Sequence, residues 1–364
     1  MTRIDLPPEI DLPPPDPASL TATGPQLAAG VWRYRGWLPD VEPVSLGEPT
    51  TPLVPLDRPG PSVLAKLEGA QPTGSFKDRG TAVLVAWLRA NGIGEIVEDS
   101  SGNAGASIAA YAARAGLRAR VFVPETASPA KLGQIRAHGA EIVIVQGPRA
   151  AATDAAVAAV EAGEAVYASH LRQPAFLAGT STFAYELWEQ LGRAAPDAVV
   201  VPLGGGTLLL GAHRGFSRLR DAGLIARVPR LVGVQAAACR PLADAFDSGA
   251  TDAAAMEPGP TLAEGIRIAR PPRSPEILAA VRATAGTIVA VSERAIGSAL
   301  RELLGRGLYV EPTSAVALAG YRLLEADRWL APGESIVIAL TGHGLKTPGA
   351  IDSLLAKGRP AGRR

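Results

Sequence analysis

Short apolar runs alternate along the chain with segments whose apolar residues recur at helical spacing. Residues 63–67 and 198–201 form short apolar runs, whereas residues 76–90 and 103–115 show a helical pattern. Further short runs lie at 96–97, 118–123, 141–145, 231–235, 288–291 and 335–340. Strands that are apolar on both sides are typical of sheets covered by helices on both faces. The alternation therefore predicts an α/β fold whose sheets are largely parallel.

The length of the chain allows more than one such sheet. Its 364 residues are enough for two domains, and glycine-rich segments occur in two separate regions. We expect two open, twisted α/β domains with a cleft between them. The predicted boundaries are an extended or disordered arm over 1–30, a large domain over 31–90 and 182–350, a small mobile domain over 91–181, and a flexible tail over 351–364.

The composition narrows the classes of function. Apolar residues make up 47% of the chain, and 36 basic residues nearly balance 35 acidic ones, which leaves a formal charge of +1. This balance argues against nucleic acid and against a membrane surface as partners. The single cysteine, Cys239, excludes a disulfide within the chain and a Cys-based zinc site. The four histidines lack the spacing of metal ligands, so no metal is expected.

No segment has the pattern of a membrane span or of a secretory signal. The N-terminus lacks the apolar stretch of a signal peptide. The longest apolar run, residues 198–212, is interrupted by Pro202 and three glycines, and it is shorter than the ~18 residues that a spanning helix needs. We therefore expect a soluble, cytoplasmic protein.

A lysine at the start of a predicted helix is the first candidate for chemistry. Residues 72–80 read Pro-Thr-Gly-Ser-Phe-Lys-Asp-Arg-Gly, a turn followed by a helix, with Ser75 and Asp78 at the spacing of a capping box. Lys77 then lies in the first helical turn, where the positive end of the helix dipole disfavours a cation. Such an amine is suited to form a Schiff base. The ordinary alternative is a solvated surface lysine.

A second candidate lies where a predicted strand passes into a helix, at residues 99–107. The backbone N–H groups of 101–104 would form a site for an anion such as a carboxylate. Asn103 could donate a hydrogen bond to a ring hydroxyl. The alternative is an ordinary helix cap.

Two more strand-to-helix segments follow later in the chain. In residues 202–208, three glycines and Thr207 could hold a phosphate, although the sequence of a nucleotide-binding P-loop is absent. In residues 340–348, Thr341 would lie at the carboxyl end of a strand, where open α/β sheets bind ligands. Each segment by itself could also be an ordinary tight turn.

Taken together and in this order, the four segments resemble the pyridoxal-phosphate enzymes of the tryptophan synthase β fold type, also called fold type II. Among these the chain most closely resembles threonine synthases. The matching motifs are Ser-Phe-Lys-Asp-Arg-Gly at 75–80, Ser-Gly-Asn-Ala at 101–104, Gly-Gly-Gly-Thr at 204–207 and Leu-Thr-Gly-His-Gly-Leu-Lys at 340–346. Weaker likenesses lie at 32–35, 46–53 and 311–315, so the resemblance runs from about Val31 to Pro348.

The resemblance implies pyridoxal 5'-phosphate as cofactor, bound by the large domain. Lys77 would hold the cofactor as a Schiff base and, once released, remove the α-proton of an amino-acid substrate. Asn103 would hydrogen-bond a ring oxygen, and Thr341 would lie at the pyridine nitrogen, which favours elimination and replacement. The residues implied at the cofactor phosphate are Gly204, Gly205, Gly206 and Thr207. Those implied at the substrate carboxylate are Ser100, Ser101, Gly102 and Ala104.

The chain departs from the threonine synthase pattern where those enzymes bind the phosphate of their substrate. In them a stretch reads Asn-Ser, then an Arg, then Glu-Gly-Gln-Lys-Thr. Here Ala168 stands in place of the Asn and Ser181 in place of the Lys, and Ala104 stands where threonine synthases have Thr. Arg172 or His170 could restore a phosphate contact, and Arg172 is counted among the predicted substrate-binding residues.

These departures leave several activities open. The first is threonine synthase, which converts O-phospho-L-homoserine and water into L-threonine and phosphate. The second is an ammonia-lyase of the threonine or serine dehydratase kind. Dehydratases also contain the sequence Ser-Ser-Gly-Asn, which this chain has at 100–103. Another pyridoxal-phosphate replacement enzyme is a third, and a cofactor-carrying protein without turnover a fourth. The intact Lys77, Asn103 and Thr341 argue against the last. By resemblance the protein is expected to form a homodimer.

Overall fold

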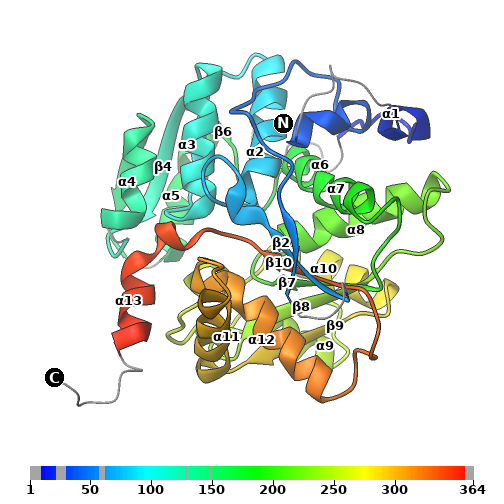
Figure 1. Ribbon diagram of the computed structural model, residues 1–364. Coiled ribbons are helices and arrows are strands. Elements are labelled where there is room, and N and C mark those ends of the chain that lie inside the picture. Colours follow the sequence, from blue (N-terminus) through cyan, green and yellow to red (C-terminus); the bar gives the residue numbers. More distant parts are fainter. Residues whose placement is uncertain (1–9, 22–29, 57–61, 128, 148, 357–364) are drawn as a thin grey trace. The chain divides into compact units, whose positions relative to one another are not determined.

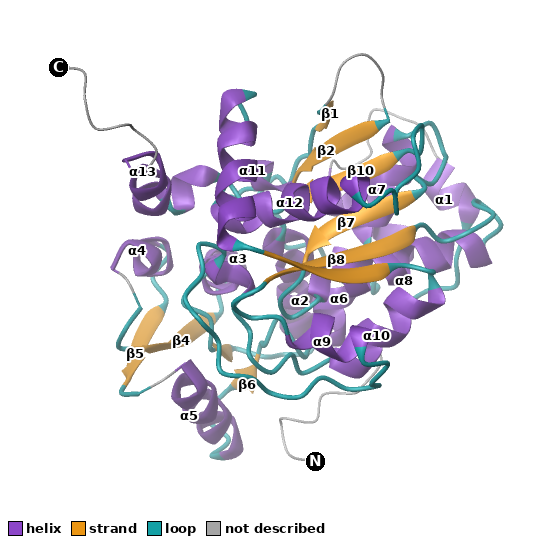
Figure 2. Cartoon of the chain, turned by 90° about the horizontal axis from the view of Figure 1, so that it is seen from below, coloured by secondary structure: helices purple, strands orange, loops and turns teal. Residues whose placement is uncertain are grey.

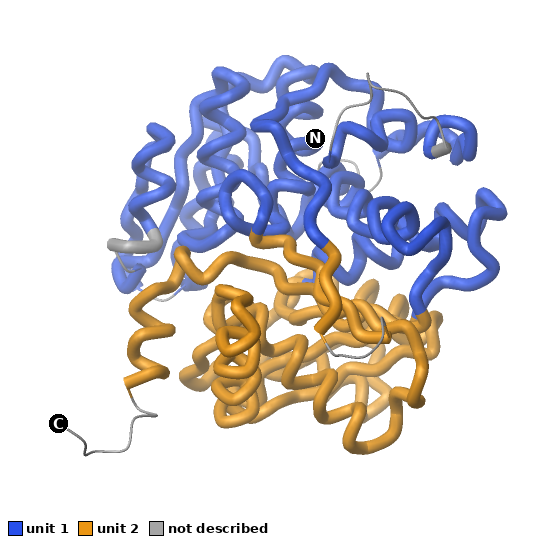
Figure 3. Tube along the Cα trace, viewed as in Figure 1, with its two compact units in different colours: residues 1–52, 70–196, 206–229 blue, residues 53–69, 197–205, 230–364 orange. Residues whose placement is uncertain are grey.

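The computed structural model describes residues 10–21, 30–56, 62–127, 129–147 and 149–356. They form two compact units, each assembled from separate stretches of the chain (Figure 3). Unit 1 comprises residues up to 52, residues 70–196 and residues 206–229, and unit 2 comprises residues 53–69, residues 197–205 and residues from 230 onward. No helix within these described ranges is long and apolar enough to cross a membrane.

Unit 2 is built on a six-stranded sheet in the order β1-β2-β10-β7-β8-β9 (Figures 1 and 2). The strands are β1 (Leu53–Pro55), β2 (Val63–Leu67), β7 (Ala198–Pro202), β8 (Arg230–Ala236), β9 (Thr287–Val291) and β10 (Ile336–Leu340). All neighbours are parallel except β1 and β2, which are antiparallel. Every residue of β7 and β10 is buried, as their unbroken apolar sequences predict.

Unit 2 contains the helices α9 (Pro241–Asp247), α10 (Ser274–Ala283), α11 (Glu293–Gly305), α12 (Pro312–Ala326) and α13 (Pro348–Ala356), with 3-10 turns at Glu264–Ile266 and Gly344–Lys346. Three of these helices cover the two faces of the sheet. α12 packs on one face, and α9 and α10 pack on the other (Figure 2). Gly320 lets α12 approach the sheet closely, because a Cβ at that position would lie 2.3 Å from the side chain of Val234.

Unit 1 contains a four-stranded, fully parallel sheet in the order β5-β4-β3-β6. Its strands are β3 (Glu95–Glu98), β4 (Arg118–Pro124), β5 (Glu141–Val145) and β6 (Val166–Tyr167). Its helices are α1 (Pro17–Thr21), α2 (Lys77–Ala90), α3 (Asn103–Ala115), α4 (Pro129–Ala137), α5 (Arg149–Glu161), α6 (Pro174–Thr180), α7 (Thr182–Gln190) and α8 (Thr207–Asp221), with a 3-10 segment at Gly30–Trp37. The predicted α/β fold with two largely parallel sheets is confirmed.

The small sheet lies wholly within residues 91–181, the segment predicted to be a small mobile domain. Whether this segment moves as a domain stays a prediction. α2, which precedes this segment, packs against α3 and α6 within it. The buried apolar side chains of these helices form one core cluster, which includes Leu84 and Phe176.

Both ends of the described chain are more ordered than the sequence predicts. In the expected arm, Pro17–Thr21 form α1, and Trp37 Nε1 donates a hydrogen bond to Asp16 O over 2.9 Å. Residues 1–9 and 22–29 of that arm lie outside the described residues. In the expected tail, α13 continues to Ala356 because Ile351 and Leu354, one helical turn apart, are buried in the core of unit 2. Residues 357–364 lie outside the described residues.

Candidate active site

Lys77 is the first residue of α2, but the hydrogen bonds of the turn before it differ from the predicted capping box. The residue that caps α2 is Phe76, without a side-chain hydrogen bond, and Ser75 Oγ is buried with no hydrogen-bond partner among the described residues. Asp78 instead accepts hydrogen bonds from the N–H and the Oγ1 of Thr73, each over 2.6 Å. The expected capping role of Ser75 is therefore wrong, because the carboxylate of Asp78 satisfies the turn.

Asp78 also ties the helix of Lys77 to the helix of Asn103. Ser107 Oγ on α3 donates a hydrogen bond to Asp78 Oδ1 over 2.6 Å, and both side chains are fully buried. Ser107 lies one turn after Asn103, the first residue of α3. Since α2 and α3 also pack together, this bond fixes the start of one helix relative to the other. Sequence reasoning did not find this link.

Aromatic rings surround the half-buried Lys77 side chain. Its Nζ lies 4.4 Å from the ring centroid of Phe76 and 5.9 Å from that of Phe176. Phe176, on α6, is fully buried and packs onto Gly80 of α2, where a Cβ would lie 2.6 Å from the ring. Phe176 belongs to none of the four motifs, so the sequence carried no signal for its place beside the lysine.

The start of α3 has the features of an anion site. Gly102 caps the helix without a side-chain hydrogen bond, and its N–H donates to Ser100 Oγ over 3.3 Å. Ser101, Gly102 and Asn103 are half-buried, whereas Ala104 is buried. Backbone N–H groups and the helix dipole at such a start favour a negative group. These properties support the predicted carboxylate site.

The residues that depart from the threonine synthase pattern have distinct environments. Ala168 and Ser181 are buried, and Ser181 Oγ donates a hydrogen bond to Leu177 O of α6 over 2.9 Å. Ala168 has no polar side-chain group, and the hydrogen of the Ser181 hydroxyl is used within α6. Arg172 is exposed, whereas His170 is buried. The two side chains that were expected to replace the phosphate contact thus differ sharply in accessibility.

The glycine-rich loop connects β7 of unit 2 to α8 of unit 1. In unit 2, a Cβ at Gly204 would lie 2.9 Å from the Cα of Ile266, so only glycine fits there. In unit 1, Gly206 has φ of +76° and caps α8 without a side-chain hydrogen bond. Thr207, the first residue of α8, is buried. Gly205 completes the loop, which leads into a 15-residue helix with the N-terminal polarity that favours phosphate.

Thr341 directly follows β10 in unit 2. Its Oγ1 lies 3.4 Å from Ser314 Oγ, and Ser314 in turn accepts a hydrogen bond from Gly342 N over 2.9 Å. Because β7 and β10 are parallel neighbours, Thr341 and Gly204 follow strands that end at the same edge of the sheet. Sequence reasoning noted the segment around Ser314 only as a weak likeness and missed this support of Thr341.

A buried group of titratable side chains follows β3 and β6 in unit 1. His170 Nδ1 lies 3.1 Å from Glu98 Oε1, and the His170 N–H donates to Glu98 Oε2 over 3.2 Å. Burial raises the pKa of Glu98 well above its ordinary range. Burial, and then the charge of Lys77, lowers the pKa of His170 well below its ordinary range. Although burial opposes ionisation of Asp99, Arg149 holds the pKa of that carboxyl at about 2.

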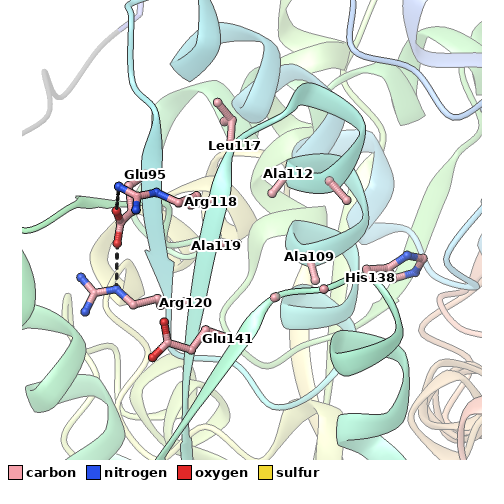
Figure 4. Close-up of a pocket in the computed structure, with 12 residues that line it drawn as sticks. Glu95, Ala109, Ala112, Leu117, Arg118, Ala119, Arg120, His138 and Glu141 are labelled. Carbon is pink, nitrogen blue, oxygen red and sulfur yellow. Dashed lines mark ion pairs between the residues drawn. The ribbon is translucent and has the colours of Figure 1, made fainter.

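Unit 1 also has a cavity of about 390 Å³, which none of the predicted site residues lines (Figure 4). It is lined by Glu95 and Arg118, the first residues of β3 and β4, and by the last turns of α3. Asn103 begins α3, so the cavity and the predicted carboxylate site lie at opposite ends of that helix. Glu95 pairs with Arg118 over 2.6 Å and with Arg120 over 3.1 Å, and Glu164 also pairs with Arg120 over 2.9 Å, so two carboxylates offset the two guanidinium groups.

The residues present fit the needs of pyridoxal phosphate. A Schiff-base cofactor needs an amine, which Lys77 supplies at the start of α2. Its phosphate needs several backbone N–H groups and room for close approach, as in the uncapped, glycine-rich entry to α8. Its pyridine nitrogen needs a small polar partner, and the buried Thr341–Ser314 hydroxyl pair has that chemistry.

Comparison with known proteins gives a consistent result. Residues 44–342 match the family model described as pyridoxal-phosphate dependent enzyme. The threonine synthase of Methanocaldococcus jannaschii is 37% identical over 334 residues, which is 88% of this chain and 82% of that protein. The threonine synthase of Synechocystis sp. is 36% identical over 349 residues, covering 91% of this chain and 87% of that protein.

Solved structures have the same fold. The threonine deaminase of T.th. superposes with a TM-score of 0.66 and 31% identity, covering 77% of this chain and 87% of that one. A fungal L-serine ammonia-lyase from Rhizomucor miehei superposes with a TM-score of 0.75 and 23% identity, covering 87% of this chain and 100% of that one. The fold is therefore that of the fold type II enzymes. The chain belongs to the family of pyridoxal-phosphate-dependent enzymes, within which it is a threonine synthase-like lyase.

Proposed function

We propose that the protein is a threonine synthase, which converts O-phospho-L-homoserine and water into L-threonine and phosphate. The similarity to threonine synthases over most of the chain carries this proposal. The positions of the four motif segments, each at a helix start or a strand end, support it.

In this proposal the four motif segments hold the cofactor. Lys77 would hold it covalently, Asn103 would donate a hydrogen bond to its ring oxygen, and Thr341, supported by Ser314, would contact its pyridine nitrogen. The backbone N–H groups of Gly204, Gly205, Gly206 and Thr207 would hold its phosphate. When bound, pyridoxal phosphate supplies an electron sink for the negative charge that develops at the α-carbon of the substrate.

The protein's own groups do the remaining work. The substrate carboxylate binds at the start of α3, where the helix dipole stabilises a negative charge. The residues proposed for this contact are Ser100, Ser101, Gly102 and Ala104. The amine of Lys77 takes the α-proton and returns it later in the reaction. Phe76 and Phe176 flank that amine. Arg172 would contact the phosphate that leaves.

An ammonia-lyase acting on threonine or serine is the second candidate. It is favoured by the buried Ala168, which has no polar side-chain group for a substrate phosphate, and by Ser181, whose hydroxyl hydrogen is used within α6. The similarity to a threonine deaminase structure at 31% identity points the same way.

One experiment separates the two activities. The purified, cofactor-loaded enzyme is given O-phospho-L-homoserine, and release of phosphate and formation of threonine are measured. L-Threonine and L-serine are tested in parallel for 2-oxoacid formation, and Lys77→Ala serves as the inactive control. Phosphate release with threonine formation, abolished in Lys77→Ala, supports the proposal. Production of 2-oxoacid without phosphate release would replace it by the ammonia-lyase.

We further propose that the enzyme is a cytoplasmic homodimer in which residues 91–181 move as a small domain. These properties follow from the family resemblance. Light scattering during size-exclusion chromatography tests the dimer, cell fractionation tests the location, and hydrogen exchange with and without substrate tests the movement.

A further inference from the structure

The pairing of β3 with β6 brings two loop segments together in unit 1. Val97 pairs with Tyr167, and the N–H of Ala168 donates to Val97 O over 2.8 Å. Parallel neighbours end at the same edge of a sheet. Glu98 and His170, which lie in or just after these strands, therefore come to lie side by side although they are far apart in sequence.

Glu98 fixes the imidazole of His170 through two contacts. Glu98 Oε1 meets Nδ1 over 3.1 Å, and Oε2 accepts the backbone N–H over 3.2 Å. Both carboxyl oxygens are thus used by one residue, and the Glu98 side chain is fully buried. The other ring nitrogen, Nε2, has no hydrogen bond to any residue that the structure describes. A buried imidazole held in this way presents one polar atom to a ligand.

His170 and Lys77 both lie beside the ring of Phe176. Its ring lies edge-on to Phe176, with centroids 5.9 Å apart and planes at 66°. Lys77 Nζ lies 5.9 Å from the centroid of the same Phe176 ring. The two side chains are thus neighbours of one buried aromatic residue.

The charges around the pair determine which ring nitrogen carries hydrogen. Arg149 keeps Asp99 ionised, and burial and the charge of Asp99 raise the pKa of Glu98. Burial and the charge of Lys77 keep the imidazole neutral by lowering its pKa. A Glu98 carboxyl that carries a proton would donate it to Nδ1 and so place the ring hydrogen on Nε2.

We propose that His170, held by Glu98, is a specificity-determining residue whose Nε2–H donates a hydrogen bond to the side-chain oxygen of the amino-acid substrate. This deepens the proposed function and rests on it, because it requires an amino acid whose side chain carries an oxygen leaving group. A phosphate ester and a hydroxyl share that chemistry. Arg172, exposed at the surface, then has the lesser part in recognising this oxygen.

Two near-isosteric substitutions test the contact. The amide nitrogen of Gln can take the place of Nε2, whereas that of Asn takes the place of Nδ1. His170→Gln is expected to stay within about twofold of the wild type in KM for the active substrate, and His170→Asn to raise that KM roughly three- to tenfold, the loss of one neutral hydrogen bond. His138→Asn, at the separate cavity, is the control and leaves KM unchanged. Equal effects of His170→Asn and His170→Gln on KM would overturn the proposal.

A second measurement does not depend on turnover. The chain has only four histidines, so ¹⁵N spectra of the cofactor-loaded enzyme can assign His170 by comparison with His170→Asn. We expect the Nε2–H form, unchanged as the pH crosses 6.5, and a shift of Nε2 on adding inorganic phosphate or L-threonine. A protonated ring, an Nδ1–H form, or no shift with either probe contradicts the role of His170. If the wild type turns over neither O-phospho-L-homoserine nor threonine or serine, the proposed function fails. The ¹⁵N spectrum then shows by itself whether His170 binds the side-chain oxygen of a ligand.

Discussion

The helices α2 and α6 of unit 1 approach each other closely at Gly179, so a larger residue at this position should destabilise the fold. A Cβ at Gly179 of α6 would lie 2.1 Å from Arg79 O and 2.8 Å from the Cα of Gly80, both on α2. Non-bonded carbon atoms pack at about 3.5–4.0 Å, so the two helices must separate by roughly 1 Å to accept a methyl group. Because both obstructing atoms belong to the backbone, no side-chain rotation relieves the clash.

The expected loss of stability in Gly179→Ala follows from two opposing contributions. Overpacking of a core costs about 1–3 kcal/mol, and a backbone clash belongs at the upper end of that range. Replacing Gly by Ala inside a helix contributes about 1 kcal/mol in favour of folding. The free energy of unfolding should therefore fall by about 2 kcal/mol. Gly133→Ala is the matched control, because Gly133 is exposed in α4 with no atom within 4 Å of its Cβ position, and it should raise stability by up to about 1 kcal/mol.

Urea unfolding followed by circular dichroism measures both variants. Arg79 and Gly80 directly follow Asp78 and Lys77 on α2, so the displaced helix should also weaken cofactor retention in Gly179→Ala but not in Gly133→Ala. If the two variants shift the urea midpoint in the same direction, the close approach of α2 and α6 does not constrain the fold, and the reasoning is refuted.

Three further predictions concern the polar framework of unit 1. Ser107→Ala removes the 2.6 Å hydrogen bond to Asp78 and should lower the free energy of unfolding by about 1.5–3 kcal/mol, as measured by urea unfolding. An unchanged free energy of unfolding would show that this bond does not fix α3 to α2. Arg79→Met leaves the Glu186 carboxylate buried without its partner at 2.8 Å and should cost about 3–5 kcal/mol, whereas adding Glu186→Met should recover part of that loss in the same assay. The pKa of Asp99 is lowered from 3.8 to about 2, so its ionised form adds on the order of 2 kcal/mol to the free energy of unfolding. This contribution is fully present above pH 3.8 and is lost as the pH falls from 3.8 through about 2. Asp99→Asn should therefore flatten the stability profile in that window, and an unchanged profile would contradict the assignment.

Positions that depend on local sequence could be predicted, whereas contacts between segments far apart in the sequence could not; the roles of Lys77 and Thr341 stay predictions. Lys77 and Thr341 lie where an apolar run changes to a helix or a loop, and that change is visible in the sequence. Asp78 and Ser107 are 29 positions apart, and Glu98 and His170 are 72 apart. Their contacts depend on helix packing and on the strand order β5-β4-β3-β6, which no local pattern encodes.

The same limit explains the capping of α2. Ser75 and Asp78 have the right spacing for a capping box, but the carboxylate of Asp78 finds stronger donors in Thr73 and Ser107. The buried carboxylate of Asp78 accepts hydrogen bonds from Thr73 and Ser107 rather than capping the helix with Ser75. Leaving the carboxylate and these donors unpaired would cost more free energy than leaving the single hydroxyl of Ser75 unpaired. At the chain ends, the helix over Pro348–Ala356 was missed because its two buried residues are separated by polar ones.

The strand order of unit 2 has a consequence for the emerging chain during translation. β10, at Ile336–Leu340, lies between β2 at Val63–Leu67 and β7 at Ala198–Pro202, so the central strand of the larger sheet leaves the ribosome last. The small sheet of unit 1 is complete once residue 167 has been made. A nascent chain that stops before residue 336 therefore exposes the facing edges of β2 and β7, apolar strands with unpaired backbone groups. Such edges associate readily with other chains, so premature termination in this gene product should lead to aggregation rather than to a partly active fragment.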